Sequence, residues 1–136
     1  MPIDITVHTA RKLAYFRFAG RLDTKACAKA FVDYTDHPAF DPAFVMLSDS
    51  RHLDSVDTQF SNLLSAALSL QPRMRLFRTP ALSIVHARTE TLYGSARMMQ
   101  QVVEPLSRIR FEILRDETDA LRRARQPEAC FQDLEG

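Results

Sequence analysis

Two polar segments contain groups that could take part in chemistry, and each directly follows a short apolar run. The apolar runs are Phe44–Leu47 and Ala81–Val85. The candidate ligand-binding residues that come after them are Asp49, Ser50, Arg51, His86 and Arg88. Because ligands of open α/β sheets bind outside the carboxyl ends of the strands, we expect the two segments to lie together at one edge of a sheet.

The chemistry expected of this edge is the binding of a small anion. Guanidinium groups form paired hydrogen bonds with carboxylate and phosphate, and helix N-termini attract negative charge. Arg21 and Arg115 would lie at the same edge. The alternative is that residues 48–52 are only the solvated turn between a strand and a helix, with Arg51 and Arg88 paired to nearby acids.

A catalytic site is a second interpretation of the same residues. His86 and a serine at position 48 or 50 could act as base and nucleophile in a small hydrolase or transferase. The chain has only three glycines and no G-x-S-x-G sequence, so neither an oxyanion hole nor a phosphate-binding loop is indicated. We expect a non-enzymatic protein without catalytic residues and keep the hydrolase as an alternative.

The carboxylates do not indicate a metal site. Asp49, Asp54 and Asp57 could be imagined around Mg²⁺, which prefers oxygen ligands. Their spacing matches no metal-binding motif, and Asp57 is better explained as a helix cap. We therefore expect no metal and no cofactor.

Hydrophobic periodicity indicates the strands that would position these residues. Residues 3–8 and 13–20 alternate between apolar and polar side chains and are joined by a polar turn, which predicts an antiparallel hairpin. Residues 44–47 and 81–85 are continuous apolar runs, as expected for strands buried on both faces. Residues 108–114 alternate again, which predicts an edge strand.

Apolar side chains at helical spacing predict four main helices. Their stripes run over residues 27–34, 60–68, 92–103 and 116–125. The expected N-terminal caps are Asp23 or Thr24, Asp57 or Thr58, Thr89, and Asp116. The order β-β-α-β-α-β-α-β-α predicts an α/β fold with right-handed crossovers and a mixed, mostly parallel five-stranded sheet.

Composition restricts the function classes. The chain of 136 residues has a formal net charge of +1, which does not indicate a nucleic-acid surface. No apolar run is long enough for stable membrane insertion, and the first residues lack the apolar region of a signal peptide. Cys27 and Cys130 belong to no CxxC pair and are expected to be free thiols. We expect a cytoplasmic protein.

The element order resembles the SpoIIAA-like or STAS-like group, named after sulfate transporters and anti-sigma factor antagonists. The likeness rests on the phrases "YGSARMMQ" (93–100) and "FEILRDETDALRRAR" (111–125), covers residues 3–125, and is strongest to an uncharacterised bacterial stand-alone branch. It implies a single STAS-like domain over residues 1–125. Residues 126–136 would form a C-terminal tail docked through Phe131 and Leu134.

The resemblance also implies a candidate phosphorylation site. Regulatory STAS proteins carry an Asp-Ser-Ser-Gly-Leu-type motif whose serine is phosphorylated by a partner kinase, which switches their binding. Here the corresponding segment is Asp54-Ser55-Val56-Asp57, so only Ser55 is carried over. The second serine and the glycine of the motif are replaced, which argues against the switch.

Tyr93 and Met98 are expected to provide a partner surface, because they add apolar area outside the core stripe of their helix. A homodimer would be the simplest occupant. The leading hypothesis is a non-enzymatic STAS-like binding or regulatory domain that acts through a protein partner or a small ligand. The alternatives are a kinase-switched regulator with Ser55 as phosphosite and the small hydrolase. The residues do not identify the ligand, partner or pathway.

Overall fold

Five strands form one sheet whose spatial order follows the chain, β1-β2-β3-β4-β5. The computed structural model describes residues 3–135. β1 and β2 are antiparallel, and every later pair of neighbours is parallel, which confirms the predicted mixed sheet. The strands are β1 (Ile3–His8), β2 (Leu13–Asp23), β3 (Val45–Asp57), β4 (Ala81–His86) and β5 (Ile109–Leu114).

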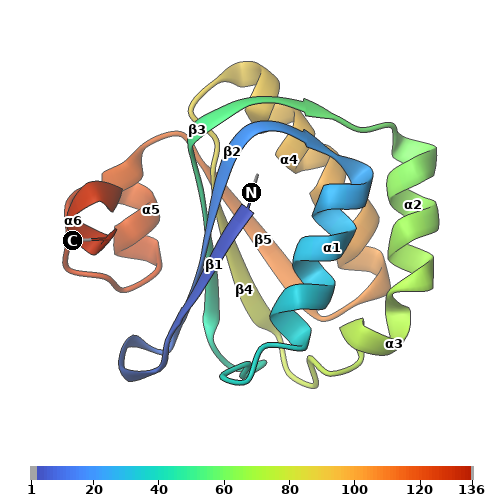
Figure 1. Cartoon of the computed structure of the whole chain (residues 1–136), viewed down its shortest axis with the longest axis horizontal. Coiled ribbons are helices and arrows are strands. Elements are labelled where there is room, and N and C mark those ends of the chain that lie inside the picture. Colours follow the sequence, from blue (N-terminus) through green and yellow to red (C-terminus); the bar gives the residue numbers. More distant parts are fainter. Residues whose placement is uncertain (1–2, 136) are drawn as a thin grey trace.

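The helices lie on both faces of this sheet (Figure 1). They are α1 (Thr24–Thr35), α2 (Phe60–Ser69), α3 (Gln71–Met74), α4 (Glu90–Val103), α5 (Glu117–Arg123) and α6 (Phe131–Glu135), with 3₁₀ turns η1 (Thr9–Arg11) and η2 (Glu104–Leu106). Right-handed crossovers between strands that follow one another place every connecting helix on the same face. Helices α1, α2 and α4 therefore cover one face, and α5 and α6 cover the other (Figure 1).

Three of the four predicted helix caps are confirmed. The side chains of Asp23, Thr89 and Asp116 accept hydrogen bonds from the first turns of α1, α4 and α5, at 2.8, 3.1 and 3.2 Å. The prediction that Asp57 or Thr58 caps α2 was wrong. Gln59 occupies the cap position without a side-chain hydrogen bond, and Asp57 belongs to β3 and pairs with Arg21.

The polar residues 48–52 lie within a strand, so the interpretation of this segment as a strand-to-helix turn was wrong. β2 continues through Gly20, which adopts φ +71°, and pairs with β3 as far as Asp57. The register shifts twice along this pairing, as at β-bulges. Beyond Ser48, β3 no longer pairs with β4 and has only β2 as a neighbour. The end of β3 is therefore less enclosed by the sheet, and polar residues can occupy it.

Alternation along the strands produces a separate core on each face of the sheet. Met46 and its neighbours pack under α1, α2 and α4, whereas Leu47 packs toward α5 and α6. The C-terminal segment completes the second core. The prediction that it docks through Phe131 and Leu134 is confirmed, since both side chains are buried there.

None of the helices within residues 3–135 combines the length and the apolar character needed to cross a lipid bilayer.

Replacing Phe131 with Ala should lower the free energy of unfolding by about 3–5 kcal/mol, because a fully buried aromatic ring is lost from the core under α6. Urea unfolding would measure this change. Phe60→Ala is the matched control, since Phe60 is 48% exposed and its loss should cost only about 0.5 kcal/mol. Equal effects of the two substitutions would contradict the packing of α6.

Candidate functional site

The structure brings the predicted ligand-binding residues together beside the end of β4. Ser50 Oγ lies 3.2 Å from His86 Nδ1. Arg88 donates from Nε to the Ser50 carbonyl at 3.1 Å, and from its terminal nitrogen to the Leu53 carbonyl. The side chains of Asp49, Ser50 and His86 are buried. The cluster is therefore part of the interior, and its hydrogen bonds hold β3 to the segment after β4.

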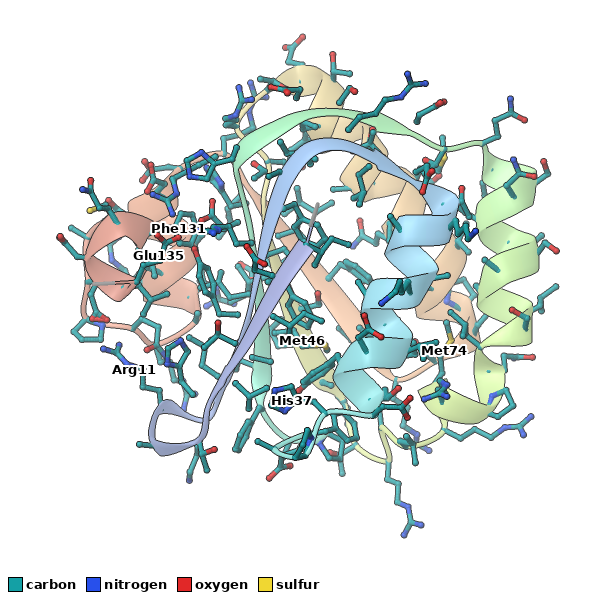
Figure 2. All side chains as sticks on the ribbon, viewed as in Figure 1. Arg11, His37, Met46, Met74, Phe131 and Glu135 are labelled. Atoms are coloured by element: carbon teal, nitrogen blue, oxygen red, sulfur yellow. The ribbon has the colours of Figure 1, made fainter. Side chains whose placement is uncertain are left out.

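Asp49 is the centre of a buried charged network on the α6 side of the sheet. Its carboxylate accepts hydrogen bonds from the Arg51 main chain at 2.9 Å, from Arg51 Nε at 3.0 Å, and from the Tyr15 hydroxyl. Arg51 also pairs with Glu135 of α6 and lies over the Phe131 ring, 5.4 Å from its centroid. Figure 2 shows Phe131 and Glu135 on this side, opposite Met46 and Met74.

The same network shifts the ionisation of its members. Burial, reinforced by Asp49, raises the pKa of the Tyr15 phenol above its usual value. Burial disfavours a charge on Arg51, but the Asp49 carboxylate outweighs this effect and raises the pKa of the guanidinium. Tyr15 therefore remains a hydrogen-bond donor, and Arg51 remains charged. Sequence reasoning missed Tyr15 and Glu135, because they belong to an alternating strand and to the C-terminal tail.

His86 does not have the geometry of a general base in a catalytic triad. Its Nδ1 accepts the main-chain N–H of Ser50 at 3.3 Å, and Asp49 Oδ1 lies 3.9 Å from the same nitrogen. A triad needs the nucleophile and the acid at different ring nitrogens. His86 is only 3% exposed, and burial lowers its pKa. The arrangement therefore gives no support to the hydrolase alternative.

Anion binding at this edge stays a prediction. Arg51 is engaged by Asp49 and Glu135, Arg88 by main-chain carbonyls, and Arg21 by Asp57. An anion would have to replace these partners, whereas Arg115 is exposed. Within residues 3–135, no group of three or more His, Cys, Asp or Glu side chains is placed to hold a metal ion.

The other candidate residues lie apart from this network. Ser55 is half-buried within β3, where it pairs with Arg21 of β2. Tyr93 packs partly against the small core around Leu22, and Met98 packs partly against the larger core under α1, α2 and α4. Both residues of the predicted partner surface thus have internal contacts. Their role toward a partner, and the phosphorylation of Ser55, stay predictions.

The feature that sequence reasoning missed is a cavity of about 230 Å³ between the sheet and helices α1, α2 and α4. Small side chains leave this space unfilled. They are Ala30, Ala67 and Ala96 on the helices, and Ser48 and Ser83 on the sheet. The signal in the sequence was the presence of alanine and serine at positions where the periodicity predicts core.

Comparison with solved structures identifies the fold. The chain is similar to an uncharacterized protein from the DUF3478 family from Shewanella loihica PV-4, whose crystal structure at 2.25 Å resolution has a SpoIIAA-like fold. The TM-score is 0.53 at 17% sequence identity, and the match covers 90% of this chain and 93% of that chain. No protein-family model and no curated protein matches the chain.

The protein therefore has a SpoIIAA-like α/β fold, as the sequence resemblance predicted.

Replacing Asp49 with Ala should destabilise the fold by about 1–3 kcal/mol, because Arg51 and Tyr15 would lose their buried acceptor and keep only Glu135. Asp54→Ala provides the control on the same strand, since Asp54 is exposed. We expect the control to change the unfolding free energy by about 0.5 kcal/mol in urea titrations. A mild effect of Asp49→Ala would show that the network contributes little.

The pKa of His86 predicts a pH dependence of stability. Burial lowers this pKa in the folded state below its ordinary value of 6.5. Below pH 6.5, His86 therefore binds a proton more readily in the unfolded chain than in the folded chain. The free energy of unfolding should therefore fall as the pH drops below 6.5, and should be insensitive to His86 above it.

Urea unfolding of the wild type and of His86→Gln at about pH 7.5 and about pH 5.5 would measure this dependence. The variant should lose less stability on acidification than the wild type. His52→Gln is the control, because His52 is exposed. The prediction fails if His86→Gln and wild type lose equal amounts.

Proposed function

We propose that this protein is a non-enzymatic binding domain that holds a small apolar molecule in the cavity between the sheet and helices α1, α2 and α4. The observation that carries the proposal is the cavity itself. It lies where a protein of this size would normally place its tightly packed core, and it is lined by residues of helices α1 to α4 and strands β2 to β5.

The volume supports the binding of a molecule rather than of water. Protein interiors normally pack as densely as organic crystals. A space of about 230 Å³ leaves the side chains around it without the packing contacts that a filled core would provide. An apolar cavity of about 150 Å³ already admits benzene. A ligand with one or two rings, or a comparable chain, would restore the missing contacts.

The character of the lining defines the ligand class. Most lining side chains are aliphatic or aromatic, as Phe16, Leu63 and Val85 are. No Asp, Glu, Lys or Arg lines the cavity among the residues that the structure describes. A charged group would be desolvated there without a partner, which costs several kcal/mol. We therefore propose that the ligand is uncharged and binds inside the cavity, away from the arginines at the sheet edge.

Helix α2 is the element that would admit the ligand. Its inner face contributes Leu63 and Ala67 to the cavity wall. It begins without a side-chain cap and ends at the break before α3, where Pro72 occupies the first turn. Elements with few stabilising end contacts open at low free-energy cost. Displacement of α2 would therefore widen the space available to the ligand.

The same helix would connect ligand binding to a protein partner. On its outer face, Phe60 and Leu68 are each 48% exposed. A ligand that repositions the inner face of α2 would also move these apolar side chains. We infer that the domain acts as a regulatory module of the STAS-like kind, in which occupancy of the cavity changes the surface that α2 presents.

Filling the cavity tests the proposal. Naphthalene should bind the wild type, and Ala67→Phe should weaken binding at least ten-fold because the new ring occupies the site. Fluorescence titration would measure binding, and thermal unfolding would check the fold. Ala96→Leu is a second, milder filling variant.

Ala43→Phe is the matched control, because Ala43 is exposed and lies outside the cavity. It should bind naphthalene like the wild type. The proposal is overturned if the wild type binds no apolar molecule of this size, or if folded Ala67→Phe and Ala96→Leu bind as tightly as the wild type.

A further inference from the structure

Two serine residues form a polar spot on the sheet side of the apolar cavity. Ser48 lies in β3 and Ser83 lies in β4, and both line the cavity. Ser48 is opposite Val85, and Ser83 is opposite Met46. Because residues two positions apart along a strand face the same side, the two serines are diagonal neighbours on the face that α1, α2 and α4 cover.

The hydroxyl groups of these serines are not used by the fold. Neither hydroxyl forms a hydrogen bond to another group within residues 3–135. Among the described residues, every buried side-chain nitrogen or oxygen that water cannot reach has a hydrogen-bond partner. The Ser83 hydroxyl must therefore be reachable by a water-sized molecule. Since Ser83 is only 7% exposed and lines the cavity, the hydroxyl is reached from the cavity.

The partnered serines of the cavity wall make the contrast clear. Ser50 Oγ interacts with His86 Nδ1 at 3.2 Å, and Ser95 Oγ donates to the Thr91 carbonyl at 3.2 Å. Central strands of a parallel sheet normally carry branched apolar residues facing the helices. At positions 48 and 83, serine instead leaves two free hydroxyls and less bulk beneath an apolar space.

We infer that the cavity selects an uncharged, mostly apolar molecule that carries one hydrogen-bonding oxygen, such as an aromatic alcohol or ketone, and that Ser48 and Ser83 anchor this oxygen. The inference rests on the proposed function and specifies its ligand class. A serine hydroxyl both donates and accepts, so the pair can bind a ligand hydroxyl as donor and as acceptor.

The lining of the cavity also predicts which ligand classes should bind weakly. A carboxylate at this position would meet two neutral hydroxyls and no cation, because the lining within the described chain contains no Lys or Arg. A hydrocarbon without oxygen would fit the space but leave both hydroxyls unpaired. The expected order of affinity is therefore aromatic alcohol, then hydrocarbon, then carboxylate.

Three probes of one ring system test this order. We expect 2-naphthol to bind the wild type about ten-fold more tightly than naphthalene, and 2-naphthoate to bind more weakly than either. In Ser48→Ala/Ser83→Ala, the advantage of 2-naphthol over naphthalene should disappear. Fluorescence titration gives the affinities, and Ser83→Ala alone serves as a second variant if the double variant is less stable.

Ser95→Ala is the matched control, because this serine also lines the cavity but its hydroxyl is satisfied within α4. It should keep the preference for 2-naphthol. If the wild type binds naphthalene and 2-naphthol equally, or the serine variants keep the preference, the anchor is overturned while the apolar site stands. If the wild type binds neither probe, the site and the anchor are both overturned.

Discussion

The architecture depends on one constraint, the right-handed crossover between neighbouring parallel strands. Strands β2 to β5 follow one another in space as in the chain, so each crossover places its helix on the same face of the sheet. Helices α1, α2 and α4 are therefore crowded on one side, and the other side would be left bare. The segment after β5 covers that side, and Phe131 and Leu134 of α6 are buried there.

The two faces of the sheet are packed differently. On the α5 and α6 face, apolar residues fill the space, and a charged network of Tyr15, Asp49, Arg51 and Glu135 connects the sheet to the last helix. On the opposite face, alanines of the helices meet serines of the sheet and leave about 230 Å³ unfilled. The first face is therefore closed by packing and ion pairs, whereas the second leaves the space in which we propose that a ligand binds.

This division changes the meaning of the polar cluster that first suggested a site. Asp49, Arg51 and His86 are the residue types that catalysis or anion binding would use, but here their hydrogen bonds are directed at each other, at main chain and at α6. By contrast, the hydroxyls of Ser48 and Ser83, which line the cavity, form no hydrogen bond within the described residues. A side chain can bind a ligand through the hydrogen-bonding groups that the fold leaves without a partner. Residue type alone does not reveal which groups these are.

The element order and three of the four caps could be predicted from residue patterns, because periodicity and capping are local properties. The mixed sheet followed from the element order, and the docking of Phe131 and Leu134 from their apolar character. The sequence also predicted that Asp49, Ser50, Arg51, His86 and Arg88 lie close together, and hydrogen bonds do connect them. Their binding of a ligand stays a prediction. The sequence could not predict that β3 continues to Asp57, since that depends on pairing with the extended β2. The engagement of the arginines and the presence of the cavity could not be predicted either, because both depend on which side chains of distant elements come into contact in the folded chain.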